Sequence, residues 1–305
     1  MVVAWRQTNL ANAELRVAYV CSLGVSKKDL AKLLVRHPQI LEYSIERTMA
    51  PRVAYLRSLG VAEKELGCMI TREPSLLECS VERAFKPRVR YLTESVGIRE
   101  KDMAAVVRRS PQILTQSIEG SLAPRVAFLR SLGIDFLGLA HMVTRHPQLL
   151  HYSVESGMRP RIAFLNSLGL SKKELAHILV RLSQILSLSV EDNLRPKYEY
   201  LVTHLGGNAA TIAKFPAYLS LSLDQRIRPR HEFIAARNKL RGSVFPMKWM
   251  AMTDADFCAA TECSLEDYES FKHSVLLNRF ADKFGKGGSR GSGSSAHAKT
   301  APPKV

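Results

Sequence analysis

The chain has 305 residues, of which 46% are hydrophobic, and its 44 Lys and Arg against 28 Asp and Glu give a formal net charge of +16. This excess of positive charge indicates a polyanionic partner, and the apolar content is sufficient for a substantial buried interior. The five cysteines include no Cys-x-x-Cys pair, which argues against a secreted disulfide framework and a zinc site. No apolar run approaches the roughly 18 residues of a membrane span.

The first twenty residues, MVVAWRQTNLANAELRVAYV, lack the charged and apolar regions of a secretory signal. They contain two arginines and no acid before Glu14, a composition that is similar to the end of an organellar transit peptide. A chain that begins inside a longer protein is equally compatible with it.

Three landmarks then recur at intervals of 33–37 residues, beginning with a partial repeat that ends at Gly24. The first is a helix-starting proline followed by a cation, at Pro51, Pro87, Pro124, Pro160, Pro196 and Pro229. The second is an internal proline, as in RHPQIL, at Pro38, Pro74, Pro111, Pro147 and Pro216, with Ser183 in its place once. The third is glycine, at Gly24, Gly60, Gly97, Gly133, Gly169, Gly206 and Gly242.

Each landmark predicts a local structure. Pro51 fits the first position of a helix, where its missing N–H is not needed, and Gly60 supplies the left-handed residue that ends this first helix. A second helix begins at a capping box, as at Ser26–Asp29 and Ser171–Glu174, and stops before the internal proline. Ser44 caps a short helical turn leading to the next helix-starting proline. Each repeat is therefore predicted to be helix, turn, helix and short turn.

Apolar residues recur with the same period. An aromatic residue stands four positions after each helix-starting proline, at Tyr55, Tyr91, Phe128, Phe164, Tyr200 and Phe233. An aliphatic residue or methionine stands six positions after each glycine, at Leu30, Leu66, Met103, Leu139, Leu175 and Ile212. We interpret both sets as core, because a repeat this short cannot bury its apolar face alone and must stack on its neighbours. The predicted fold is an all-α solenoid of about 36-residue repeats.

Two positions are basic in every repeat. The helix-start row follows the helix-starting proline and consists of Arg52, Arg88, Arg125, Arg161, Lys197 and Arg230. The proline row lies two positions before the internal proline and consists of Arg36, Arg72, Arg109, Arg145, Arg181 and Lys214. Further cations near the later helix-starting prolines are Arg159, Arg195, Arg226 and Arg228, the last two in the cluster RIRPR. We predict all sixteen as candidate nucleic-acid contacts.

Each row also has a structural explanation. A cation in the proline row stands in the last turn of the second helix, where it interacts favourably with the negative end of the helix dipole. A cation in the helix-start row stands in a first turn, where the dipole disfavours it and something must compensate. That partner is either a row of phosphates or the acid five residues before the proline, such as Glu46 or Glu82.

The repeats resemble mTERF motifs, the units of the mitochondrial transcription termination factor family. The segments that carry the resemblance include RHPQILEYSIERTMAPRVAYLRSLGV, RHPQLLHYSVESGMRPRIAFLNSLGL and KFPAYLSLSLDQRIRPRHEF, the last similar to the closing unit of plant-type members, and the resemblance covers about residues 10–242. PPR and TPR arrays have similar periods but lack a proline turn of this kind in each unit. The resemblance implies a right-handed superhelix in a chloroplast or mitochondrion, with a basic groove for double-stranded DNA.

The chain is expected to divide into an array at residues 1–242, a helical cap at 243–284 and a disordered basic tail at 285–305. We find no Gly-rich phosphate loop, no His-Glu-x-x-His and no Gly-x-Ser-x-Gly, and therefore expect no enzyme, cofactor or metal. Three hypotheses remain open. The first is a double-stranded DNA binder that regulates organellar transcription. The others are an RNA binder in splicing, ribosome assembly or translation, and a scaffold that binds a protein through the cap.

Overall fold

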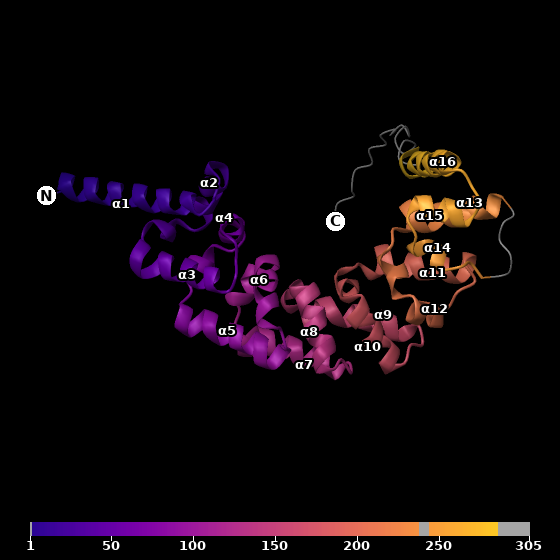
Figure 1. The fold of residues 1–305 in the computed structure, drawn as a ribbon, viewed down its shortest axis with the longest axis horizontal. Coiled ribbons are helices and arrows are strands. Elements are labelled where there is room, and N and C mark those ends of the chain that lie inside the picture. The colour runs from indigo at the N-terminus through magenta and orange to yellow at the C-terminus, as the bar shows by residue number, and fades with distance from the viewer. Residues whose placement is uncertain (1, 238–243, 286–305) are drawn as a thin grey trace, which may run out of the picture. The chain divides into compact units, whose positions relative to one another are not determined.

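The computed structural model describes residues 2–237 and 244–285, and this part of the chain is built from α-helices without a β-strand (Figure 1). The prediction of an all-α helical-repeat fold is confirmed. The helices are α1 (Val2–Ser22), α2 (Lys27–Arg36), α3 (Ala50–Ser58), α4 (Glu63–Arg72), α5 (Lys86–Tyr91), α6 (Glu100–Arg109), α7 (Ala123–Ser131), α8 (Phe136–Arg145), α9 (Arg159–Ser167), α10 (Lys172–Arg181), α11 (Arg195–His204), α12 (Ala209–Lys214), α13 (Arg228–Ala236), α14 (Lys248–Ala251), α15 (Asp254–Ala260) and α16 (Leu265–Gly285).

The second helices end where predicted, but their starts vary. At α2 Ser26 accepts from the N–H of Asp29 without the return bond, and α6 has no side-chain cap. Ser171 accepts a hydrogen bond from the backbone N–H of Glu174, whose carboxylate accepts one from the N–H of Ser171, so this capping box is complete. Every second helix from α2 to α12 ends two residues before the internal proline position. Short 3-10 turns then follow at Pro38–Leu41, Pro74–Leu77, Pro111–Leu114, Pro147–His151, Ser183–Ser187 and Pro216–Ser220.

The helix-starting proline is not the first residue of its helix, so that prediction is wrong. Ser44 caps a wide helical turn at Ile45–Met49, in which the N–H of Met49 donates to the carbonyl of Ser44, five residues back. This turn runs directly into α3, where Pro51 is the second residue. The wide turn accommodates a ring that has no N–H to donate and would clash with an ordinary i−4 carbonyl. Equivalent wide turns occur at Val81–Phe85, Ile118–Leu122, Val154–Met158, Val190–Leu194 and Leu223–Ile227, and a further one at Leu92–Val96.

The glycines end the first helices as predicted. Gly97 has φ 87°, in the left-handed region that a side chain rarely adopts, and a Cβ there would lie 2.7 Å from the ring of Phe136 in the next repeat. The five other glycines of this series in the described residues also have positive φ, and Gly242 lies outside them. Each glycine therefore permits the reversal from first to second helix.

The chain forms two compact bodies. Among the described residues, the N-terminal body comprises residues 2–203 and 207–220, and the C-terminal body comprises residues 204–206, 221–237 and 244–285. In the N-terminal body the second helices stack in sequence order, with α6 on α8, α8 on α10 and α10 on α12. The aliphatic set is buried throughout, whereas the aromatic set is half-buried at Tyr55, Tyr91 and Phe128. The predicted boundary at 242 and nearly all of the tail lie outside the described residues.

In the C-terminal body α13 packs against α16, and the rings of Phe233, Phe257 and Tyr268 contact one another in the core. Phe245 and Pro246 lie just before α14, and the similar pair Phe215 and Pro216 stands at the start of a 3-10 turn. Thr253 then caps α15 by accepting from the N–H of Asp256 at 3.1 Å, as the serines cap the wide turns. Residues 245–260 therefore continue the repeat pattern in degenerate form.

Candidate nucleic-acid interface

The helix-start row bonds to main-chain carbonyls inside its own repeats. In each case the guanidinium reaches from the first helix to the turn that follows the second helix. The Nε–O distance is 2.8 Å for Arg52 and Cys79, and 2.9 Å for both Arg125 with Tyr152 and Arg161 with Leu188; Arg88 bonds to Gln116 in the same way. These cations therefore close each repeat into a triangle of helix, helix and turn.

Several members of this row have further or different partners. Arg52 also donates to the carbonyls of Thr48 and, at 3.1 Å, Glu78. Nη1 of Arg161 donates to the carbonyls of Ser156 and Gly157 at 3.2 and 2.8 Å, so this side chain also satisfies carbonyls of the wide turn that precedes it. Lys197 is 4% exposed, and its Nζ donates to Asn193 Oδ1 at 2.6 Å and to the Leu219 carbonyl at 2.8 Å. Burial lowers the pKa of Lys197 to about 8. Lys197 is therefore not presented to an external polyanion, and the half-buried Arg161 already donates to three carbonyls.

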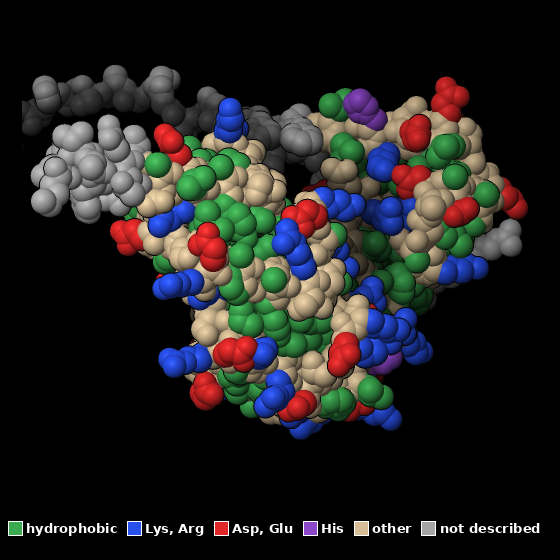
Figure 2. Space-filling view, turned by 60° about the vertical axis from the view of Figure 1, so that its left-hand side comes forward, with side chains coloured by type: hydrophobic (Ala, Val, Ile, Leu, Met, Phe, Trp, Pro, Cys, Tyr) green, Lys and Arg blue, Asp and Glu red, His purple; other side chains and the backbone are tan. Residues whose placement is uncertain are grey.

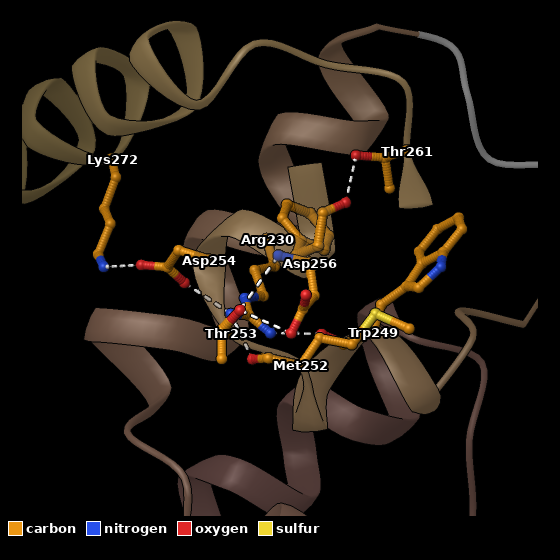
Figure 3. Close-up of polar contacts among 9 residues, drawn as sticks. Arg230, Trp249, Met252, Thr253, Asp254, Asp256, Thr261 and Lys272 are labelled. Atoms are coloured by element: carbon orange, nitrogen blue, oxygen red, sulfur yellow. Dashed lines mark hydrogen bonds and ion pairs between the residues drawn. The ribbon is translucent and has the colours of Figure 1, made fainter. Parts of the chain in front are cut away.

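Arg230 is fully buried in the C-terminal body (Figure 3). It donates to the carbonyls of Trp249 and Met252, pairs with Asp254 at 2.6 Å and lies 4.9 Å from the centre of the Phe257 ring. Lys272 holds the other oxygen of Asp254 at 2.9 Å. Burial opposes ionisation of this carboxyl, but the two cations hold its pKa below the usual value. Arg230 therefore closes the last repeat and cannot contact nucleic acid in this conformation.

Arg16 makes the same contact as the helix-start row but was not predicted from the sequence. The Nε of Arg16, on α1, donates to the carbonyl of Tyr43 at 2.7 Å, the same contact that Arg52 makes with Cys79. The signal was available, because the segment ELRVAYVCSLG aligns with APRVAYLRSLG although it lacks the proline. The partial repeat therefore closes in the same way as the complete ones.

Four of the six acids expected to compensate the helix-start row pair with a different cation, the residue just before the helix-starting proline, four positions further along the chain. The pairs are Glu82 with Lys86 at 2.6 Å, Glu155 with Arg159 at 2.7 Å, Glu191 with Arg195 at 2.8 Å and Asp224 with Arg228 at 3.5 Å. Glu46 and Glu119, which are followed at that position by Ala50 and Ala123, accept from the hydroxyls of Ser44 and Ser117 instead. Arg159 and Arg195 also lie over the rings of Phe128 and Phe164. The remaining candidate, Arg226, is half-buried.

The first half of the proline row links neighbouring repeats. Arg36 donates to the carbonyl of Thr71 at 3.1 Å, Arg72 to that of Arg109 at 2.9 Å, and Arg109 to that of Thr144 at 2.9 Å. Each acceptor lies at the end of the next second helix, where carbonyls lack helical partners. These three guanidinium groups are exposed, but part of their hydrogen-bonding capacity is already used.

The second half of the proline row differs. The side chains of Arg145, Arg181 and Lys214 are exposed and have neither a hydrogen bond nor an ion pair to any described residue. They border two adjoining cavities of about 470 and 300 Å³, which together we call the basic trough. No Asp or Glu lines it. Its lining residues are His141, Arg145, His146, Arg181, Leu182, Ser183, Gln184, Lys214, Phe215, Pro216, Ala217 and Ser220.

The trough contains the one 3-10 turn that starts with serine instead of proline. Ser183 lines the larger cavity, and Leu182 before it is buried. His146 lines the same cavity, and its Nε2 lies 3.2 Å from the Tyr152 hydroxyl while its Nδ1 has no partner. Burial lowers the pKa of His146, which therefore stays neutral near pH 7. The positive charge of the trough comes from its two arginines and its lysine.

On the face of the molecule that Figure 2 shows, Lys and Arg side chains lie in small groups, several of them beside Asp or Glu. Arg57 with Glu63 and Arg99 with Asp102 are such pairs, each at 2.6 Å. Exposed pairs of this kind contribute little to stability and reduce the field that a polyanion experiences. The basic trough is therefore distinguished by the absence of acids rather than by the number of cations.

A search among known families gives an independent result. The profile of the mTERF family matches residues 4–167 and 155–258. The chain belongs to the mTERF family. The match extends past residue 242 into α15, in agreement with the degenerate repeat around Pro246. No curated protein sequence matches the chain.

Membership places the chain among nucleic-acid-binding regulators of organellar gene expression, which are generally not enzymes. Among the described residues, no helix is long and apolar enough to cross a membrane. The same residues contain no group of three His, Cys, Asp or Glu side chains that could hold a metal ion. The three exposed cations of the trough can form charge-assisted bonds to phosphate oxygens without first breaking internal bonds.

Proposed function

We propose that this mTERF protein binds double-stranded DNA through the basic trough and thereby regulates transcription in an organelle. The observation that carries the proposal is that Arg145, Arg181 and Lys214 come from three consecutive repeats, lie exposed around adjoining cavities and have no internal partners. Cations at such intervals can follow a phosphate backbone, which supplies most of the affinity of sequence-independent DNA binding.

The lining of the trough favours a duplex over an unpaired strand. Proteins that bind single strands stack the bases on exposed aromatic rings. Phe215 is the one Phe, Tyr or Trp in the trough, and it is half-buried. Elsewhere in the array, Phe128 and Phe164 lie under Arg159 and Arg195. The trough is thus equipped for a charged backbone more than for bases.

The test is a salt series of binding to four probes of one sequence: duplex DNA, duplex RNA, single-stranded DNA and single-stranded RNA. The variant Arg145→Gln/Arg181→Gln/Lys214→Gln removes three charges from the trough. If all three contact phosphates, the slope of log K against log salt falls by about 2.7, and the affinity near 0.15 M salt falls on the order of 10²-fold. Fluorescence anisotropy measures both quantities.

The matched control is Arg36→Gln/Arg72→Gln/Arg109→Gln, which removes the same charge from the first half of the proline row. We expect its slope to change by less than about 1, because these cations are engaged by carbonyls. Equal losses in the two variants would show that the ligand follows the whole row. Tighter binding to either RNA probe would replace DNA by RNA, and no binding to any probe would favour the scaffold hypothesis.

A further inference from the structure

The end of α15 has a helix-stop motif whose two contacting positions are both cysteines. The N–H of Cys263 donates to the carbonyl of Cys258, five residues back, at 2.9 Å, and the N–H of Glu262 donates to that of Ala259 at 3.3 Å. Glu262 has φ 54° and is the one non-glycine residue with a positive φ among the described residues. These features define a Schellman motif, in which the side chain after the left-handed residue contacts the side chain five positions earlier.

This motif brings the two cysteines within reach of a disulfide. The covalent bonds from the Cα atoms to the 2.9 Å hydrogen bond add about 4 Å, so the two Cα atoms lie at most about 7 Å apart. Disulfides usually join Cα atoms that are about 4.4–6.8 Å apart. Burial raises the pKa of the Cys258 thiol, and the nearby Cys263 thiol raises this pKa further. Both cysteines are free thiols, so the pair is poised in its reduced form.

The two thiols differ in their access to solvent. Cys258 is 2% exposed, whereas Cys263 is half-buried, with its Sγ 3.3 Å from the carbonyl of Thr261. An accessible thiol beside a buried one is the arrangement in which a reagent attacks the outer cysteine and the inner cysteine resolves the product. The other three cysteines, at 21, 68 and 79, all lie in the N-terminal body. The pair is therefore the one place in the C-terminal body where two cysteines meet.

We propose that Cys258 and Cys263 form a redox-active pair that closes to a disulfide by exchange with a small disulfide such as glutathione disulfide. The Cys263 thiolate first attacks one sulfur of glutathione disulfide, whose S–S bond breaks, and one glutathione leaves and takes up a proton. Cys258 then loses its proton, attacks the Sγ of Cys263 and displaces the second glutathione. The two cysteines lose two electrons and two protons, and glutathione disulfide takes them up as two molecules of glutathione.

Closure would fix the end of α15, the helix that holds Asp254 and Phe257 against Arg230. The modification would therefore act on the body in which Arg230 closes the last repeat. It does not rest on the proposed function, because every residue that lines the basic trough lies in the N-terminal body.

The test is a redox titration of the full chain in buffers with increasing ratios of glutathione disulfide to glutathione. Each sample is quenched with acid, alkylated in denaturant and digested with trypsin for mass spectrometry. The tryptic peptide of residues 249–272 contains both cysteines of the pair and none of the other three. We expect this peptide to lose both alkyl groups and to become two hydrogens lighter than the reduced peptide. The mixed disulfide on Cys263 should disappear about tenfold faster at pH 8 than at pH 7, because more of the Cys258 thiol is ionised.

Three single variants separate the roles of the two thiols. Cys258→Ala should leave a stable mixed disulfide with glutathione on Cys263. Cys263→Ser should leave the 249–272 peptide without glutathione, because Cys258 is buried. The matched control Cys68→Ser removes the exposed cysteine and should leave closure unchanged. Circular dichroism checks that each variant is folded.

Three outcomes would overturn the inference. In the first, the 249–272 peptide keeps both alkyl groups at every ratio. In the second, it carries glutathione that the second thiol never displaces. In the third, Cys258 or Cys263 forms its disulfide with a cysteine of the N-terminal body.

Discussion

In the helix-start row, every side chain from Arg52 to Arg230 has a carbonyl, amide or carboxylate partner within the fold. In the basic trough, Arg145, Arg181 and Lys214 have none among the described residues. The cations of both regions belong to rows with the same period and the same residue types, yet those of the helix-start row close each repeat and those of the trough are available to a ligand. A row of cations in a solenoid is therefore informative about binding only once its internal partners are known.

The largest expected effect separates the two regions by stability. Arg161→Met removes charge-assisted bonds to three carbonyls and should lower the free energy of unfolding by about 3 kcal/mol and the Tm by roughly 10 °C. Thermal melts followed by circular dichroism measure this loss. Duplex affinity at a temperature where the variant is folded should be unchanged. The control Arg159→Met breaks an exposed ion pair and an exposed contact with the Phe128 ring, and should change stability by about 1 kcal/mol or less.

The opposite result for Arg161→Met would contradict this division of roles between the helix-start row and the basic trough. If Arg161→Met melted like the parent but bound DNA more weakly, the helix-start row would belong to the interface and its carbonyl contacts would be secondary. Charge reversal of Arg125, Arg161 and Arg230 together would not test binding, because the loss of their internal hydrogen bonds and ion pair is expected to unfold the repeats that contain them.

An intermediate effect concerns pH. His151 lies between repeats, bonded to Ser110 and Gln116, and burial with the nearby charge of Arg125 lowers its pKa from 6.5 to about 4. Because the unfolded chain takes up this proton first, the contribution of His151 is fully present above pH 6.5 and is lost as the pH falls towards 4. The Tm of the parent should fall more steeply over this range than that of His151→Thr, which carries the residue found at Thr115 in the preceding repeat. Parallel curves would exclude a buried neutral His151.

The smallest effect concerns the trough itself. Ser183→Pro restores the residue that the other 3-10 turns have, at a position where its N–H makes no hydrogen bond. Since proline restricts the unfolded chain, we expect a gain of about 0.4–1 kcal/mol and a rise in Tm of roughly 1–3 °C. Duplex affinity should change by less than about threefold if the trough acts through its cations. A larger loss in a folded variant would add Ser183 to the contacts.

The period, the prolines and the glycines were enough to predict the fold, because each has a local consequence for backbone conformation that does not depend on the rest of the chain. The wide turn before Pro51 was not predictable in this way, since proline at the second position of a helix looks the same in sequence as proline at the first. The candidate interface was predicted only as a set of sixteen residues. Arg109 and Arg145 occupy the same repeat position, but only Arg109 reaches a carbonyl of the next repeat. That difference depends on how two neighbouring repeats pack.

The contact that closes each repeat has a consequence for how such proteins arise. Arg52, Arg88, Arg125 and Arg161 each bind a main-chain oxygen within their own repeat, so the joint needs no particular side chain at the accepting turn. A gene segment that encodes one repeat can therefore be duplicated, and its accepting turn can then diverge in sequence, without loss of the joint. A protein that gains or loses repeats would contact a longer or shorter stretch of its ligand. Each remaining repeat would keep its own closing hydrogen bond.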